Sequence, residues 1–135
     1  MSEQPPALTP AQIDAVLRFL PMLEQPDYSP GEWSQGGYQM PYYSYRPDFD
    51  AFIDALYDQG LVFAFDWMNW QDEAKRYRTD SAALESADLL AVRKLLTAHV
   101  RADRFVEGHL AAVFAEGHLT AILQRLKQLR ARLTD

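Results

Sequence analysis

The feature that most constrains this chain is a row of aliphatic residues at helical spacing between residues 89 and 113. Positions three and four apart share one face of an α-helix. The row runs through Leu89, Val92, Leu96, His99, Asp103, Val106, Leu110 and Val113. Its two exceptions, His99 and Asp103, are neighbours. The pattern predicts one long helix or two consecutive helices on a core, with an imidazole and a carboxylate facing that core.

A polar cluster is expected around His99 and Asp103, because buried charge is stable only when it is paired and hydrogen-bonded. The local candidates for the cation are Arg104, Arg101 and protonated His99. Arg104 is the one taken as the anchor, since a guanidinium can hold a carboxylate through two parallel hydrogen bonds. In the favoured interpretation the cluster is structural, and Asp103 caps a new helix that begins at Arg104. A ligand site and an acid–base catalytic site are the alternatives. The candidate residues are His99, Arg101, Asp103, Arg104, Glu107 and His109.

The same region carries a resemblance. The run Arg101 to Leu110, RADRFVEGHL, is similar to an R-x-D-R-F-x-E-G-H-L core found in a family of small bacterial proteins that is described as a domain of unknown function. The segment FDWMNW at 65–70 matches the family's F-D-W-x-x-W. The likeness extends from about residue 13 to about residue 129. It implies no activity, so it assigns no catalytic residues.

Helix signals recur along the rest of the chain. Thr9 and Pro10 form a helix start, and Pro21 ends or kinks the helix that follows. A second helix is expected from Pro47 to the stop signal at Gly60. The last helix has leucines on one face between residues 119 and 133.

Ser86 is expected to cap the helix that begins the aliphatic row. A break is expected near Ala102–Asp103, because an unbroken helix would be unusually long for a chain of 135 residues. The predicted fold is a single all-α domain of five or six helices over residues 9–135, preceded by a flexible tail at 1–8.

Residues 25–46 are predicted to form an irregular, aromatic-rich loop, because prolines and glycines exclude long elements there. Its aromatic residues argue against disorder; they are Tyr28, Trp33, Tyr38, Tyr42, Tyr43 and Tyr45. The favoured interpretation is a lid over the core. The alternative is a pocket wall, for which the candidate aromatics are Trp33, Tyr43, Trp67 and Trp70.

Composition and spacing exclude several classes. The absence of cysteine excludes disulfides, thiolate catalysis and zinc–thiolate sites. His99 and Glu107 would lie about 12 Å apart on one helix, too far to share an ion, and no HExxH or glycine-rich phosphate loop occurs, so neither a metal nor a cofactor is expected. No apolar run reaches the roughly 20 residues of a membrane span. The N-terminus lacks the features of a signal peptide, so a cytoplasmic location is expected.

Charge is unevenly distributed along the chain. Residues 1–92 carry five basic and fifteen acidic side chains, whereas residues 93–135 carry eight and four. We expect the two segments to meet within the fold. Nucleic-acid binding through the C-terminal helix is a weaker alternative, because its cations flank the leucine face; they are Arg125, Lys127, Arg130 and Arg132. The outer face of the same helix either faces water or forms the interface of a homodimer; it holds Ala121, Gln124, Gln128 and Ala131.

These patterns favour a cytoplasmic binding or regulatory module without chemistry of its own, whose partner is a small molecule or a protein. The alternative is a small enzyme that uses His99 with Asp103 or Glu107 as acid and base. A closed polar cluster without a cleft would favour the module. An open cavity that reaches His99, Trp67 and Trp70 would favour the enzyme.

Overall fold

The computed structural model describes residues 5–34 and 40–134, and the described residues form a helical domain with one small sheet. The elements are α1 (Pro10–Leu17), α2 (Leu20–Leu23), β1 (Gly31–Ser34), β2 (Tyr42–Tyr45), α3 (Pro47–Asp58), the 3₁₀ helix η1 (Trp67–Trp70), α4 (Gln71–Thr79), α5 (Ser81–Glu85), α6 (Leu89–Ala102), α7 (His109–Ala115) and α8 (His118–Ala131). The predicted all-α class is confirmed. The described helices outnumber the expected five or six because short ones, such as α2 and α5, lie between the longer ones.

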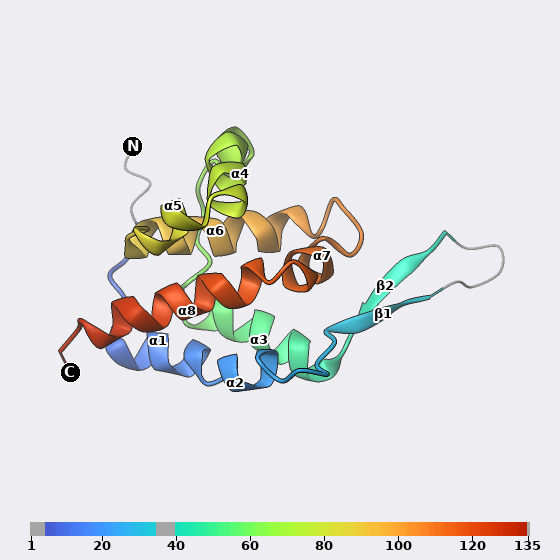
Figure 1. Ribbon diagram of the computed structural model, residues 1–135, viewed down its shortest axis with the longest axis horizontal. Helices are drawn as coiled ribbons and strands as arrows, with labels where there is room; N and C mark the ends of the chain where they lie inside the picture. Colours follow the sequence, from blue (N-terminus) through green and yellow to red (C-terminus); the bar gives the residue numbers. More distant parts are fainter. Residues whose placement is uncertain (1–4, 35–39, 135) are drawn as a thin grey trace.

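Helix α8 lies at the centre of the helical body. It packs against α1, α2, α5, α6 and α7, and Figure 1 shows α1 and α2 along one side of it and α6 along the other. Its leucine-rich face is buried in the core; the fully buried members are Leu119, Ile122, Leu123 and Leu126. The strands β1 and β2 project from one end of the body, opposite the C-terminal end of α8 (Figure 1).

Local sequence signals account for most helix boundaries. Thr9 forms a capping box with Gln12, and Pro10 occupies the first turn of α1. Pro21 lies in the first turn of α2, so the predicted interruption is present. Helix α3 begins at Pro47 and ends before Gly60, which has φ +81°.

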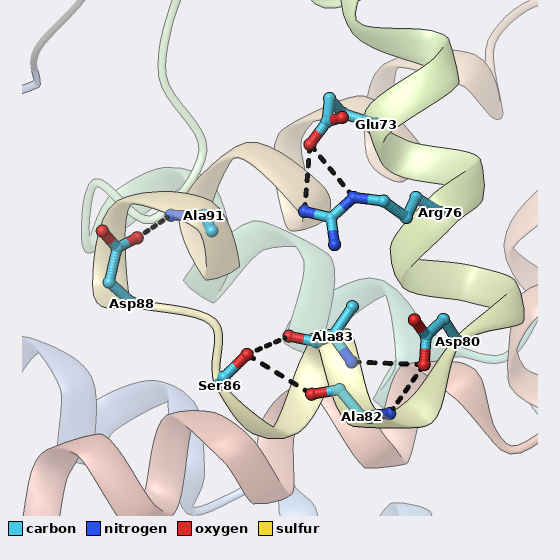
Figure 2. A network of polar contacts seen from close by, with 8 residues as sticks. All are labelled: Glu73, Arg76, Asp80, Ala82, Ala83, Ser86, Asp88 and Ala91. Carbon is cyan, nitrogen blue, oxygen red and sulfur yellow. Dashed lines mark hydrogen bonds and ion pairs between the residues drawn. The ribbon is translucent and has the colours of Figure 1, made fainter.

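Two aspartates cap the helices at the junction of α4, α5 and α6. Asp80 accepts hydrogen bonds from two N–H groups in the first turn of α5, and Asp88 accepts one from the backbone of Ala91 in α6 (Figure 2). The prediction that Ser86 caps α6 is wrong. Its hydroxyl donates to carbonyls of α5 (Figure 2), because the last carbonyls of a helix lack partners within it.

The predicted irregular loop at 25–46 is a β-hairpin in its described part, which corrects the sequence prediction. Strands β1 and β2 are antiparallel, with Gly31 opposite Tyr45 and Ser34 opposite Tyr42. Prolines and glycines excluded long elements but not strands of four residues, and aromatic residues favour strands. A Cβ at Gly31 would overlap the carbonyl of Ser44 on the other strand. Tyr38 lies outside the described residues.

The aromatics of this region divide between two environments. Tyr28 and Tyr45 pack against the core, as expected of a lid. Trp33 is 51% exposed and Tyr42 is also exposed. The lid interpretation therefore holds for the base of the hairpin and not for its outer part.

Two buried arginines join segments that are distant in sequence. Arg93 of α6 donates to the carbonyls of Pro6 (2.9 Å) and Gly60 (2.6 Å), and Arg125 of α8 donates to the carbonyl of Ala87 (2.8 Å). Gly60 and Ala87 follow the ends of α3 and α5, where carbonyls are free to accept.

Of the tail expected at residues 1–8, residues 1–4 lie outside the described part. None of the described helices has both the length and the apolar content to cross a membrane.

Candidate functional site

The aliphatic row is divided between two helices, as predicted. Helix α6 ends at Ala102, with Asp103 as its C-cap, and α7 begins at His109 after a turn over residues 103–108. Gly108 ends this turn with φ +73°, a left-handed conformation that glycine adopts readily. The turn changes the direction of the chain, so the helical register of α6 does not continue into α7.

Asp103 joins α6, α7 and the hairpin. Its Oδ1 accepts hydrogen bonds from the hydroxyl of Tyr45 (2.6 Å) and from the backbone N–H of Leu110 (2.9 Å). Asp103 therefore caps a helix, as proposed, but that helix begins at His109 and not at Arg104. The acceptor also raises the pKa of the Tyr45 phenol, after the larger effect of burial.

The predicted ion pair of Arg104 with Asp103 or Glu107 is not among those formed by the described residues. Arg104 and Glu107 are exposed, and the guanidinium of Arg104 donates to the hydroxyl of Tyr57 (3.3 Å). The physical reason is the turn, which removes residues 104–107 from the face that continues α6. Arg101 stays on α6 and is half-buried.

The three histidines of the chain meet at one place. Nδ1 of His99 lies 3.1 Å from Nε2 of His109, and the ring of His118 stands at 87° to that of His99, with centroids 5.3 Å apart. On one continuous helix the His109 side chain would point away from His99; the turn over residues 103–108 brings the two rings together instead. Helical spacing gave no indication that His118 belongs to the cluster.

A sequence signal for this meeting exists in a short repeat. Glu107-Gly108-His109-Leu110 recurs as Glu116-Gly117-His118-Leu119. Both glycines have positive φ, +73° and +83°, and each directly precedes a helix whose first residue is a histidine. The two segments thus have the same local backbone geometry. The first residue of α7, His109, and the first residue of α8, His118, both lie against the ring of His99.

Burial keeps these imidazoles neutral. It is the main cause that lowers the pKa of His99 to about 3 and of His118 to about 4, and that lowers the pKa of His109. The charge of Arg78 acts in the same direction on all three. The Nε2 atoms of His99 and His118 are buried and have no hydrogen-bond partner among the described residues.

A cavity of about 600 Å³ lies beside the histidines, between α4 and the ends of α6 and α7. Its walls are Gln71, Asp72, Ala74, Lys75, Arg78, Thr79, Ala98, His99, Ala102, His109 and Glu116. Three of these are alanines on facing helices, which leave room that larger side chains would fill. Arg78 and Glu116 form a two-point ion pair in this wall, with N–O distances of 2.6 and 2.7 Å. The cavity reaches His99, but Trp67 and Trp70 do not line it.

The four candidate pocket aromatics do not form one pocket. Trp33 and Tyr43 meet edge to face, 5.5 Å apart, beside a separate hollow of about 590 Å³ that also borders His109. Trp67 contacts Phe105 on the 103–108 turn, and Trp70 contacts Phe65 and Tyr77. Among the described residues, no three histidine or acidic side chains are arranged to hold a metal ion.

Helix α8 does not present its cations as one basic surface. Arg125 is buried, and Arg130 binds both carboxylate oxygens of Asp14 on α1 (2.8 and 3.1 Å). The acidic and basic segments therefore meet within the fold here, as expected.

The outer face of α8 is partly used within the chain. Gln124 donates to Glu24, Gln128 accepts from Arg125, and Ala121 packs against the core. The homodimer remains a prediction, and it rests on a smaller face than the sequence suggested.

Comparison with known proteins adds the family. Residues 8–132 match a family described as "Family of unknown function (DUF6508)". The chain belongs to this family. The match covers nearly all of the described residues, and it confirms the resemblance drawn from the sequence. The comparisons with curated proteins and with solved structures found no match. The DUF6508 description names no activity, so function has to be argued from the geometry of the site.

Proposed function

We propose that this protein is a binding module for a small polar molecule, and that the cavity between α4, α6 and α7 is the ligand site. The observation that carries the proposal is His99, which lines the cavity while only 4% exposed and whose Nε2 has no partner among the described residues. An unpaired buried polar atom is costly. In this proposal a polar group of the ligand supplies the missing hydrogen-bond partner.

The volume and the wall chemistry support a small ligand. Ligand cavities commonly enclose about 300–1,000 Å³ and combine apolar walls with a few polar groups. Here alanines supply the apolar wall, and the polar groups include the amide of Gln71 and the two imidazoles. The hollow beside Trp33 is less suited to a small polar ligand, because its wall is mainly aromatic and aliphatic.

An acid–base enzyme is the second candidate, and the contact between His99 and His109 is what favours it. A neighbouring group that fixes an imidazole can orient it as a general base. Asp103 and Glu107 are no longer suitable partners, because Asp103 binds Tyr45 and Leu110 and Glu107 is exposed. Catalysis is less well supported than binding, since Thr79 alone carries a hydroxyl among the described lining residues and donates it to the Lys75 carbonyl.

A ligand screen with a filled cavity tests the proposal. Ala98→Leu places a larger side chain in the cavity wall, and the control Ala51→Leu makes the same change at an exposed site on α3. Neutral, anionic and cationic polar compounds would be screened by thermal shift and by ¹H–¹⁵N NMR. We expect compounds that shift His99 and His109 signals to bind wild type and Ala51→Leu, and to lose at least tenfold in affinity for Ala98→Leu. Equal binding to Ala98→Leu would contradict the proposal.

A further inference from the structure

We infer that the hollow between the hairpin and α7 binds a trimethylammonium group, such as the one that choline carries. This hollow of about 590 Å³ is separate from the cavity between α4, α6 and α7, so the inference goes beyond the proposed function. It follows from three properties of the wall: the arrangement of its aromatic rings, its charge, and the carbon atoms that make up the rest of it.

Four aromatic rings line the hollow, in two pairs that stand nearly at right angles. Trp33 and Tyr43, opposite each other on β1 and β2, meet at 87° with ring centroids 5.5 Å apart. Tyr28, before β1, and Phe114 of α7 meet at 79° with centroids 5.7 Å apart. Rings at right angles can surround a rounded cation on more than one side, and aromatic cages hold quaternary ammonium groups through cation–π attraction.

The hairpin rings of this wall are accessible to a ligand. Trp33 is 51% exposed, and Tyr43 is half-buried. Indole is the side-chain ring that attracts cations most strongly. The most exposed ring of the wall is therefore also the one best suited to a cation.

The wall carries one carboxylate and no basic side chain among its described residues. Glu107 is exposed and forms no ion pair with any other residue that the structure describes. None of the described lining residues is a lysine or an arginine. A carboxylate without a counterion beside four aromatic rings favours a cation over a neutral ligand of the same shape.

A cation of the protein already lies over one of these rings. The guanidinium of Arg46 is 5.7 Å from the ring centroid of Tyr28 and pairs with Asp48, to which Tyr28 also donates its hydroxyl (2.9 Å). Hydrogen bonds polarise the groups that they join, so this bond makes the ring of Tyr28 more electron-rich. Arg46 borders a different hollow and does not line this one.

The remainder of the wall favours a quaternary cation over a primary one. Apart from the rings, its apolar side chains are Pro30, Val106, Ala111, Ala112 and Ala115. A primary ammonium has three N–H donors that need acceptors, and Glu107 is the one carboxylate among the described lining residues. A trimethylammonium group has no donor, and its methyl groups pack against carbon. The alanines of α7 leave room for these methyl groups.

Titrations of the full chain followed by ¹H–¹⁵N NMR test the inference. Choline and 3,3-dimethylbutan-1-ol have the same shape but only choline is charged, and ethanolamine is the primary ammonium of the same chain length. We expect choline to shift the indole N–H signal of Trp33 and to bind about tenfold more tightly than the other two, because it alone combines the charge with methyl groups. The indole signal of Trp70, which does not line the hollow, should not move.

Two matched pairs of variants locate the binding site. Tyr43→Leu removes a ring from the wall, whereas Tyr42→Leu removes the adjacent ring, which points to the other face of β2. Glu107→Gln removes the carboxylate, whereas Glu32→Gln removes one on β1 that does not line the hollow. We expect choline affinity to fall about tenfold in Tyr43→Leu and about threefold in Glu107→Gln. Both controls should bind choline as the wild type does.

The fold of each variant is checked by the amide signals of α7. If Tyr43→Leu alters these signals, Trp33→Leu replaces it, because Trp33 is the more exposed ring. The same loss of choline affinity is expected of this second variant.

A further comparison identifies the source of the group. N-acetyl-trimethyllysine amide carries the same trimethylammonium group on the side chain of a protein residue. Tighter binding of this compound than of choline assigns the hollow to a methylated protein, and the reverse assigns it to a free small molecule. Either result supports the inference.

Equal binding of choline and 3,3-dimethylbutan-1-ol would overturn the inference, and so would ethanolamine that binds as tightly as choline. An unchanged affinity in the ring variant, or no shift of the Trp33 signal by either trimethylammonium compound, would overturn it as well. Ala98→Leu, which fills the cavity beside His99, should leave choline binding unchanged. Failure of this inference and failure of the proposed function are therefore separate results.

Discussion

At the residue scale, Asp103 is the side chain that positions the candidate site. It ends α6, accepts from the first turn of α7 and accepts from Tyr45 of β2. Hydrogen bonds to a charged group contribute more than neutral ones, about 1.5–3 kcal/mol. One carboxylate thus fixes the turn that places His109 against His99.

Replacing Asp103 tests this role. We expect Asp103→Ala to lower the free energy of unfolding by about 2–3 kcal/mol, because a half-buried hydroxyl and a helix N–H lose their acceptor. Asp103→Asn keeps an acceptor oxygen and should lose less. Arg104→Ala should stay within about 0.5 kcal/mol of wild type, as expected for an exposed side chain. Urea unfolding measures all three, and a loss on Arg104→Ala as large as that on Asp103→Ala would restore the ion-pair interpretation.

The histidines give stability a pH dependence with a definite sign. Their pKa values are lowered in the folded protein, so the unfolded chain binds more protons below its ordinary pKa near 6.5. The stabilisation is complete above that pH and decreases as the pH falls towards about 4. Each histidine contributes up to about 1.4 kcal/mol per pH unit in this window.

The window from pH 6.5 to 5.0 isolates this effect, because unfolded carboxylates titrate mainly below it. Urea unfolding across the window should show a free energy of unfolding that falls with pH. His118→Asn should reduce the slope of the unfolding free energy against pH by the contribution of one proton, up to about 1.4 kcal/mol per pH unit. This change in slope is expected whatever the effect of the substitution on stability at pH 7.5. A flat profile in wild type would contradict the neutral, buried assignment.

At the element scale, the two E-G-H-L segments begin α7 and α8 in the same way but in different surroundings. A Cβ at Gly108 would lie 2.7 Å from Cζ2 of Trp33, whereas nothing lies within 4 Å of a Cβ at Gly117. Both glycines have positive φ. The two positions therefore separate backbone strain from contact with the hairpin.

Alanine at each glycine measures the two contributions. Gly117→Ala should cost about 1–2 kcal/mol, from the left-handed backbone alone. Gly108→Ala should cost more than this, because the ring of Trp33 must also move. In a Trp33→Ala background the extra cost should vanish, which a double-mutant cycle detects. Equal costs for the two glycines in the wild-type background would show that the hairpin does not press on Gly108.

At the scale of the whole molecule, Arg93 of α6 joins two segments that are distant from it in the sequence. Its guanidinium holds the carbonyls of Pro6 and Gly60 while the residue is 4% exposed. Burial lowers its pKa, and the Phe63 ring lies 5.3 Å away. A cation held by carbonyls and an aromatic ring links the N-terminal segment, the end of α3 and α6.

Arg93→Met removes these bonds while keeping an unbranched side chain. We expect the free energy of unfolding to fall by about 3 kcal/mol, because two carbonyls lose charge-assisted donors. Hydrogen exchange at residues 7–9 should also accelerate. Arg132→Met, an exposed change at the end of α8, is the matched control and should leave both measurements unchanged. Unaltered exchange in Arg93→Met would show that Pro6 is held by other contacts.

Several features followed from the sequence because they depend on neighbours within one or two helical turns. Thr9, Pro47 and Gly60 set helix boundaries through caps and backbone preferences, and the break after Ala102 followed from the length of the row. The aliphatic faces located the core for the same reason, since helical periodicity is a local property. The absence of cysteine excludes thiol chemistry on composition alone.

The site itself was decided by tertiary structure. Asp103 and Tyr45 are 58 positions apart, and Arg78 and Glu116 are 38 apart, so no local pattern links them. His109 meets His99 only because the 103–108 turn redirects the chain, and its direction depends on Gly108 beneath Trp33. Local preferences determined where helices begin and end, whereas the packing of distant segments determined which polar groups share a cavity.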